Sequence, residues 1–405
     1  MTIALEGAKA LIARRIDAEA PRLVALSHAI HDDPELSFQE HRAAARVADA
    51  LRDAGFDTKV GAYGLDTAIE ATYGSGDFVV AVCAEYDALP VIGHGCGHNI
   101  IATAGLGAAL GLAEIADRAG IRVKLLGTPA EEHGGGKAIM LEAGAWEDAT
   151  VSLMVHGGPA ADARAADFSC QAVDRYRITF TGQGAHAAAA PEAGISALSA
   201  ATLSLTAIGL LRQHLYSTTR VAAILTEGGT VTNVIPERAI IEVEIRSFDM
   251  DELADVKARV MNCFEGSAIA TGCTWERARM EPRYACVIQE PLLAKPWDDA
   301  LVELGRTLEP VTGVGGGSTD MGNVSQVVPA IHPMIAVRTT TAPPHTAAFA
   351  AAAASLDGDG TLIVGAKGLA WAAATAAIDP ESRADLLARQ AARPAGSTQV
   401  PAWDD

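Results

Sequence analysis

Residues 82–105, VCAEYDALPVIGHGCGHNIIATAG, gather side chains that hold protons or metal ions within one short segment. Cys96 and His98 stand on either side of Gly97, and Asp87 precedes them. Because glycines stand on both sides of Cys96, the backbone can bend so that a thiolate and an imidazole face one point. Cysteine and histidine together suit a borderline-soft cation such as zinc. Taken alone, however, Cys-Gly-His is more often a packing feature than a metal site.

Two later segments and a loop add groups of the same chemical kinds. LLGTPAEEHGGG carries Glu131 and Glu132, and SLMVHGGP carries His156. His345 lies in TTTAPPHTAAFA, a loop that prolines stiffen. One glutamate can bind a metal ion while its neighbour takes a proton from the activated water and returns it to a leaving amine. Together these residues predict metal-dependent hydrolysis.

An alternation of short apolar strands and helices is expected to position these groups. DFVVAVCAE, IRVKLLGT and ATVSLMVH are typical of buried strands, and helical patterns lie between them. This rhythm predicts an α/β fold with a mostly parallel sheet, in which ligands gather at the carboxyl ends of the strands. Asp87, the glutamate pair and His156 each follow such a strand, so we expect them to meet at one edge of the sheet.

The pattern changes near Val173. Strand, helix, strand, strand and helix patterns follow, which predicts an inserted α+β domain over residues 173–284. We expect residues 1–172 and 285–392 to form the two parts of a catalytic domain, and residues 393–405 to form a loose C-terminal tail.

Composition and charge narrow the class of protein. The 405 residues, 49% hydrophobic and 20% charged, predict a folded protein with two domains or one large insertion. A net charge of −19 without a basic block argues against nucleic acid or an anionic membrane as a partner. We expect no membrane span and no export, because apolar runs are interrupted and a secretory signal is not evident. The six scattered cysteines favour reduced thiols in the cytoplasm.

Over roughly residues 20–375 the chain resembles peptidase family M20, the dinuclear-metal aminoacylases and carboxypeptidases. Its Cys-Gly-His motif is similar to that of the amidohydrolase branch, which includes N-acyl-amino-acid and aminobenzoyl-glutamate hydrolases. The resemblance implies a mostly parallel-sheet metallopeptidase domain, an inserted lid and dimerisation domain, and a homodimer formed through that insert. The motifs that carry the resemblance are EYDALPVIGHGCGHN, TPAEEHGGGKAIMLEAGAW, VHGGP, FTGQGAHAAAAPEAGISAL, GGTVTNVIPE, GGGSTDMGNVSQVVPAIHP and PPHTAAF.

The resemblance implies a metal-binding role for five residues. They match positions that hold two divalent ions per chain, with the cysteine thiolate between the ions. Zinc, manganese and cobalt all suit this ligand set, so the choice of metal stays open. The five are Cys96, His98, Glu132, His156 and His345.

Other positions match catalytic and substrate-binding groups of the family. Glu131 matches the general base, and Asp87 matches a carboxylate that orients a ligand histidine. His186 matches a histidine that reaches the active site of the other subunit in a dimer and stabilises the tetrahedral oxyanion. The residues that match positions binding the substrate carboxylate are Asn233 and Arg246. The GGGST loop, with Ser318 and Thr319, is expected to line the same pocket. Arg246 has an equally good structural explanation as an ion-pair residue.

Two positions depart from the family pattern. His133 follows the glutamate pair where relatives often have glycine, and it either narrows the pocket or adds a polar contact. Asn99 follows His98 where many relatives have aspartate, which fits the aminobenzoyl-glutamate and dipeptidase-like side of the branch. The histidines interpreted as packing residues are His28, His31, His41 and His94.

The predicted function is hydrolysis of the amide bond in a small N-acyl amino acid or dipeptide-like substrate, with Glu131 as the base. The nearest alternative is hydrolysis of another small amide or of a carbamoyl compound by the same site. From a different class, a non-catalytic, metal-stabilised binding subunit remains open, although it would not need a proton-transferring Glu131. A cysteine hydrolase is disfavoured, because Cys96 and His98 are too close in sequence to align easily as nucleophile and base.

Overall fold

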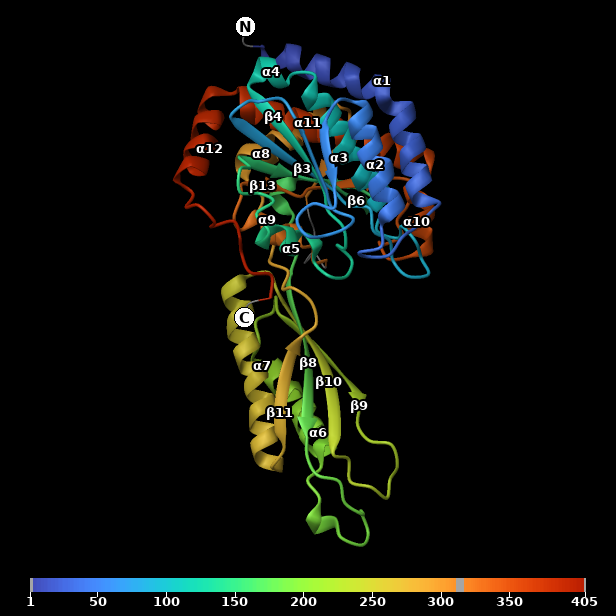
Figure 1. The fold of residues 1–405 in the computed structure, drawn as a ribbon, viewed down its shortest axis with the longest axis vertical. Coiled ribbons are helices and arrows are strands. Elements are labelled where there is room, and N and C mark those ends of the chain that lie inside the picture. The colour runs from blue at the N-terminus through green and yellow to red at the C-terminus, as the bar shows by residue number, and fades with distance from the viewer. Residues whose placement is uncertain (1–2, 311–316, 404–405) are drawn as a thin grey trace. The chain divides into compact units, whose positions relative to one another are not determined.

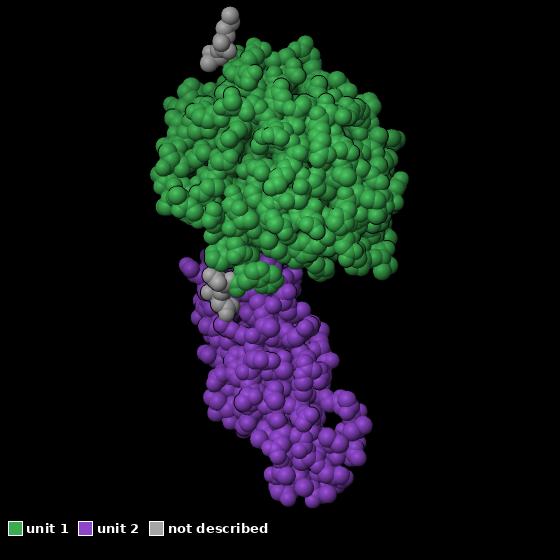
Figure 2. Space-filling model, in the orientation of Figure 1, with its two compact units in different colours: residues 1–169, 287–315, 320–404 green, residues 170–286, 316–319, 405 purple. Residues whose placement is uncertain are grey.

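The computed structural model describes residues 3–310 and 317–403, which fold as two compact units (Figure 1, Figure 2). Each unit has its own hydrophobic core. The expected insertion, residues 173–284, lies within unit 2. The described parts of unit 1 are residues 3–169, 287–310 and 320–403, and those of unit 2 are residues 170–286 and 317–319.

Unit 1 is built on a six-stranded sheet formed by β1 (Asp57–Val60), β2 (Ile69–Tyr73), β3 (Phe78–Ala84), β4 (Ile121–Gly127), β5 (Val151–Leu153) and β13 (Ala330–Ile331). The strand order is β1-β2-β4-β3-β5-β13. β3, β4, β5 and β13 are parallel, whereas β1 and β2 are antiparallel to their neighbours at one edge. This is the mostly parallel sheet that the sequence predicts.

Helices cover both faces of the sheet because the central strand is apolar on both sides. The helices of unit 1 are α1 (Leu5–His31), α2 (His41–Asp53), α3 (His98–Ala113), α4 (Ala116–Ala119), α5 (Gly136–Glu142), α8 (Pro291–Glu303), α9 (Met321–Ser325), α10 (Ala347–Ala353), α11 (Leu356–Ile378) and α12 (Pro380–Ala392), with a 3-10 turn, η1 (Ala165–Asp167). Val80 and Val82 of β3 face one hydrophobic cluster with α1, α3 and α11, and Ala81 and Cys83 face another with α5 and α9.

Short strand pairs and a terminal segment complete unit 1. The expected tail contacts the unit, since the N–H of Gly396 and the hydroxyl of Thr398 donate to Glu147 at 2.7 and 2.5 Å. These contacts could not be predicted from the sequence of the segment, whose residues are mostly small or polar.

Unit 1 also has two parallel strand pairs. They are β6 (His156–Pro159) with β14 (Met334–Val337), and β7 (Asp162–Ala163) with β12 (Leu308–Glu309).

Among the described helices, α11 is long and apolar enough to cross a membrane by length and composition. Its apolar window is 72% buried inside the protein, however. Gly368 brings it so close to Trp297 of α8 that a Cβ atom there would lie 2.7 Å from the indole ring. This packing is that of a core helix.

Unit 2 is a four-stranded antiparallel sheet of β8 (Ala172–Thr181), β9 (Arg220–Glu227), β10 (Arg238–Ser247) and β11 (Thr274–Arg279), in the order β11-β8-β10-β9. Along β8, Tyr176, Ile178 and Phe180 are buried while Arg177 is exposed, which is the alternation of a half-buried strand. The buried side chains pack against two helices. These are α6 (Ala197–Leu211) and α7 (Met250–Thr271), and the 3-10 turns are η2 (Pro191–Ala193) and η3 (Arg212–His214).

Candidate metal centre

Three neighbouring strands of unit 1 end in the acidic and histidine residues that the sequence analysis singled out. β3 is followed by Asp87, β4 by Glu131 and Glu132, and β5 by His156. Because these strands are parallel and adjacent, their carboxyl ends meet at the same edge of the sheet. This is the arrangement that the sequence predicts.

Backbone conformation brings the Cys-Gly-His loop and the His345 loop together. Gly97 has a φ of 78°, a left-handed conformation that glycine adopts at little cost, and α3 begins at the next residue. His345 also has a positive φ, 64°, which is unfavourable for a residue with a side chain. Its N–H donates to the carbonyl of Gly95 at 2.8 Å. The strained backbone of His345 is therefore held against the loop that carries Cys96.

Two groups of three potential ligands share one cysteine. The ligand atoms of Cys96, His98 and His156 all lie within 4.8 Å of one another, and so do those of Cys96, Glu132 and His345. All five side chains predicted as ligands thus come together within unit 1. A thiol common to both groups is what a cysteine between two ions requires.

Two buried atoms of this cluster lack a hydrogen-bond partner within the described part of the chain, and a metal ion would take its place. Among the described atoms, Nε2 of His98 and Oε1 of Glu132 are buried without a hydrogen-bond partner. Such atoms are costly unless something satisfies them. Nε2 of His345 lies 3.5 Å from Oε2 of Glu132. Two ligands that bind one tetrahedral zinc ion at about 2.1 Å are about 3.4 Å apart, so this pair suits a common ion.

Asp87 lies behind the cluster and contacts two of its members. Its Oδ1 is 3.0 Å from Nδ1 of His98, and its Oδ2 accepts hydrogen bonds from the hydroxyl of Ser37 at 3.0 Å and the N–H of Glu132 at 2.9 Å. Burial raises the pKa of Asp87, but His98 and the hydrogen bonds outweigh it and lower this pKa to about 2. An ionised Asp87 holds the proton of His98 on Nδ1 and leaves Nε2 to bind a metal.

Burial shifts the remaining groups of the cluster. It lowers the pKa of His156 to about 4, an effect to which the charge of nearby His98 adds. It raises the pKa of the Cys96 thiol, and burial together with Glu85 and Glu132 raises the pKa of Glu131. The neutral imidazole is the form that binds metal, whereas the thiol must lose its proton when a metal binds.

Two of the residues predicted from the insert lie beside each other in unit 2. Nδ1 of His186 accepts hydrogen bonds from the N–H groups of Ala188 and Ala189 at 3.2 and 3.0 Å. The N–H of Ala187 donates to the carbonyl of Asn233 at 2.9 Å. Two exposed loops therefore hold His186 and Asn233 near the Arg238 end of β10.

The other predicted residues of unit 2 lie at the opposite end of β10. The guanidinium of Arg246 donates to the hydroxyl of Ser318 at 2.8 Å and to Glu244 at 2.5 Å. Thr319, beside Ser318, is buried. The eight residue steps from Arg238 to Arg246 span about 26 Å in a strand. One chain therefore does not bring His186 or Asn233 next to Arg246.

The GGGST loop lies partly outside the described residues, and the structure places both residues that depart from the family pattern. The first two glycines of the GGGST loop, Gly315 and Gly316, lie outside the described residues. His133 is exposed. Asn99 is buried, and its amide donates to the hydroxyl of Ser27 at 2.9 Å and to the carbonyl of Ala353 at 3.1 Å, so it ties helices together.

Two buried residues near the cluster were not singled out from the sequence. Oε2 of Glu85 lies 3.5 Å from Nε2 of His98, and the ring of His332 lies 5.7 Å from that of His156. The spacing in the sequence could have indicated Glu85. Residues two apart in an extended segment face the same side, and Asp87 stands two residues after Glu85. His332 follows β13, which is too short to be recognised as a strand from its sequence.

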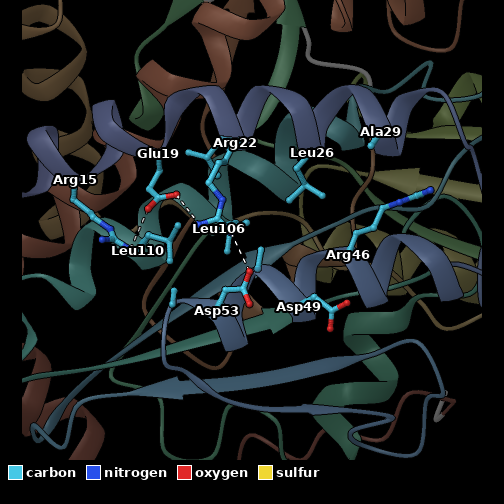
Figure 3. Close-up of a pocket in the computed structure, with 13 residues that line it drawn as sticks. Arg15, Glu19, Arg22, Leu26, Ala29, Arg46, Asp49, Asp53, Leu106 and Leu110 are labelled. Atoms are coloured by element: carbon cyan, nitrogen blue, oxygen red, sulfur yellow. Dashed lines mark hydrogen bonds and ion pairs between the residues drawn. The ribbon is translucent and has the colours of Figure 1, made fainter.

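A cavity of about 400 Å³ lies between α1, α2 and α3 (Figure 3). None of its lining residues belongs to the metal cluster. Two of its arginines pair with carboxylates that also line it, Arg15 with Glu19 at 3.2 Å and Arg22 with Asp53 at 3.1 Å. Because the cavity holds none of the proposed metal ligands, we assign it no role in the chemistry.

Known proteins share these features. A family model described as the M20 peptidase dimerisation domain matches residues 172–270. The Xaa-Arg dipeptidase of Mus musculus is 39% identical over 368 residues, which cover 87% of this chain and 84% of that protein. The human Xaa-Arg dipeptidase is 34% identical over 402 residues, covering 93% and 90%. The chain belongs to the M20 peptidase family. As an M20 member it is a metal-dependent amidohydrolase.

A solved structure agrees with the M20 fold. A dinuclear metal binding peptidase of the M20 family from Bacillus subtilis superimposes with a TM-score of 0.68 at 23% identity, over 88% of this chain and 98% of that one. At this identity the likeness shows the fold alone. One of the subunits of the p-aminobenzoyl-glutamate hydrolase of Escherichia coli is 32% identical in sequence over 64% of this chain and 58% of that protein.

Proposed function

We propose that this protein is a dinuclear-metal hydrolase that cleaves the amide bond of dipeptides or N-acyl amino acids. The observation that carries the proposal is the pair of ligand groups that share Cys96, with Glu131 beside them. In this proposal His98, Glu132, His156 and His345 supply the remaining ligands of two zinc, manganese or cobalt ions. Dipeptides with a C-terminal arginine are the first substrates to test, because the Xaa-Arg dipeptidases resemble the chain over most of its length.

The residues around the centre suggest a division of tasks. When bound, divalent ions supply Lewis-acid activation of water and of the amide carbonyl. Glu131, whose Oε2 lies 3.8 Å from Nε2 of His98, takes the proton of the attacking water and passes it to the leaving amine. Asp87 keeps His98 in the tautomer that binds metal.

Two chains are needed for the complete site in this proposal. His186 stabilises the oxyanion in the active site of the other subunit. Asn233, which lies beside His186, reaches the same site and helps to bind the substrate carboxylate. Arg246, with Ser318 and Thr319, binds the substrate carboxylate. Support for a homodimer through unit 2 comes from β9, an edge strand on which Ile224 is 60% exposed. Six cysteines without a disulfide favour a cytoplasmic location.

The test combines a substrate panel with a variant of the base. Metal-loaded protein should release free amine from Xaa-Arg dipeptides, N-acetyl amino acids or aminobenzoyl-glutamate, and lose this activity with a chelator. Glu131→Gln should lower kcat by about a hundredfold or more, since it cannot take a proton, and should keep both metal ions.

Two outcomes would count against the proposal. A wild-type protein that binds two ions but hydrolyses no member of the panel would favour a binding subunit or an unusual amide. A Glu131→Gln variant with full kcat would remove Glu131 from the proton transfer while leaving the metal centre intact.

A further inference from the structure

Glu85 is a buried carboxylate that no step of the proposed reaction uses. It follows β3, is fully buried, and approaches the metal cluster from the same strand end as Asp87. Tyr86, between them in the sequence, donates its hydroxyl to the carbonyl of Thr67. The two carboxylates flank one imidazole: Asp87 contacts Nδ1 of His98, and Glu85 faces Nε2.

One oxygen of Glu85 is anchored and the other is not. Oε1 accepts a hydrogen bond from Nζ of Lys137 at the start of α5. Lys137 is held in turn by Asp320, whose Oδ1 accepts from Nζ at 2.7 Å and whose Oδ2 accepts from the backbone N–H of Lys137 at 2.8 Å. Oε2 of Glu85 is buried and has no hydrogen-bond partner among the described atoms, and the same is true of Nε2 of His98.

Lys137 satisfies only one side of Glu85. Glu85, Lys137 and Asp320 are all fully buried, and both oxygens of Asp320 accept hydrogen bonds from Lys137. Nζ of Lys137 reaches Oε1 of Glu85 and leaves Oε2 buried without a hydrogen-bond partner among the described atoms. A buried oxygen of this kind is costly unless another group satisfies it, and a cation near Oε2 would do so.

The distance between the two unpartnered atoms suits a divalent cation that both of them bind. Oε2 of Glu85 and Nε2 of His98 are 3.5 Å apart, the same separation as between Glu132 and His345 in the second ligand group. Ligand atoms of Glu85, His98 and Glu131 also lie within 4.8 Å of one another. A tetrahedral divalent ion with ligands at about 2.1 Å places two of them about 3.4 Å apart.

We propose that Glu85 is a sixth protein ligand of the metal centre, binding through Oε2 the ion that Cys96, His98 and His156 hold. This inference rests on the proposed dinuclear centre. It makes the two metal positions unequal, because one has four protein ligands and the other, with Cys96, Glu132 and His345, has three. The first ion should therefore leave the protein more slowly than the second when a chelator is added.

The experiment measures metal binding rather than turnover. Wild-type protein stripped of metal and titrated with Co(II) should bind two ions with unequal dissociation constants, and release them to a chelator in two phases. Glu85→Gln should weaken the tighter position by about tenfold or more, remove the slow phase and change the Co(II) absorption bands. Asp162→Asn is the matched control, because it breaks another buried ion pair of unit 1, with Arg306 at 3.3 Å, and should keep both ions.

A double variant separates metal binding from folding. Glu85→Gln alone leaves Lys137 with one carboxylate fewer, so the metal-free melting temperature is measured for every variant. Glu85→Gln with Lys137→Met removes the ammonium as well, and the loss of Co(II) affinity should persist. Affinity restored in the double variant, or unchanged in Glu85→Gln, would overturn the role of Glu85 alone. Wild-type protein that bound no Co(II) would overturn the dinuclear centre as well.

Discussion

At the scale of single residues, Glu40 shows how a buried carboxylate outside the cluster supports it. Its Oε1 accepts hydrogen bonds from the N–H groups of Phe38 and Ala130, each at 2.9 Å, and its Oε2 accepts one from the hydroxyl of Thr67 at 2.9 Å. Ala130 has a φ of 59° and immediately precedes Glu131. Glu40 thus holds an unfavourable backbone conformation next to the proposed base.

The pKa of Glu40 leads to a prediction about stability. Burial, and then the charge of Asp87, raise this pKa to about 7, whereas the pKa of a glutamate in an unfolded chain is about 4.3. Between these values the folded protein keeps a proton that the unfolded chain has lost, so the free energy of unfolding falls as the pH rises. Glu40→Gln keeps the acceptor for both N–H groups and carries no charge. Its free energy of unfolding, taken relative to that of wild type, should increase by about 3 kcal/mol from pH 4 to pH 8.

Denaturant unfolding of both proteins across this pH range checks the prediction. Thr67→Val is a useful control, because it removes one hydrogen bond to Glu40 without removing the titrating group. A difference between Glu40→Gln and wild type that stays constant with pH would show that Glu40 does not change its charge in this window.

The residue types in the sequence indicated the candidate metal centre, but they did not indicate every residue around it. Cys96 and His98 stand close in sequence, so their motif could be recognised. The contacts of Glu85 could not, because Lys137 lies 52 residues further on and Asp320 another 183 residues beyond it. A pairing over such distances leaves no local pattern in the chain.

At the scale of elements, the start of α5 fixes the loop that carries the proposed base. Gly136 is the first residue of α5, and a Cβ atom there would lie 1.8 Å from the carbonyl oxygen of Pro129. Gly136→Ala should therefore push the loop that contains Glu131, lower kcat by about a hundredfold and lower the melting temperature. Gly266→Ala in α7 is the control, because a Cβ there meets no atom within 4 Å. It should stabilise the helix by about 1 kcal/mol and leave turnover unchanged.

Steady-state kinetics and thermal unfolding of the two glycine variants decide between these expectations. If Gly136→Ala kept wild-type kcat, the position of the loop would not depend on the close approach of α5 to Pro129.

The elements that the sequence predicts are those with a strong local pattern. β3 could be recognised because all seven of its residues are apolar and buried. β1 and β11 could not, because DTKV and TWERAR are mostly polar and exposed. β13 is only two residues long, and it exists because it pairs with β5, which lies far away in the sequence.

At the scale of the whole molecule, the proposed reaction depends on an exchange of residues between two chains. His186 and Arg246 lie near opposite ends of β10, separated by about 26 Å or more at the usual rise of a strand. If both act on one substrate, they must come from different chains. A homodimer with two-fold symmetry then has two equivalent sites, each completed by its partner.

Mixing two inactive variants tests this exchange. Glu131→Gln removes the base of its own site but still offers His186 to the other chain, and His186→Ala does the reverse. A hybrid dimer therefore has one complete site. Random pairing of equal amounts makes half of the dimers hybrid, so turnover should return to about a quarter of the wild-type value. His214→Ala, which removes another exposed histidine of unit 2, should remain fully active.

The mixed sample distinguishes the two geometries because the alternative predicts no recovery. If His186 served its own chain, every hybrid would pair a site without Glu131 with a site without His186, and neither would be complete. The mixture must be dissociated and reassociated, or co-expressed, so that chains exchange. Size-exclusion chromatography with light scattering verifies that the mixture is dimeric, and activity near that of the separate variants would then place His186 in the site of its own chain.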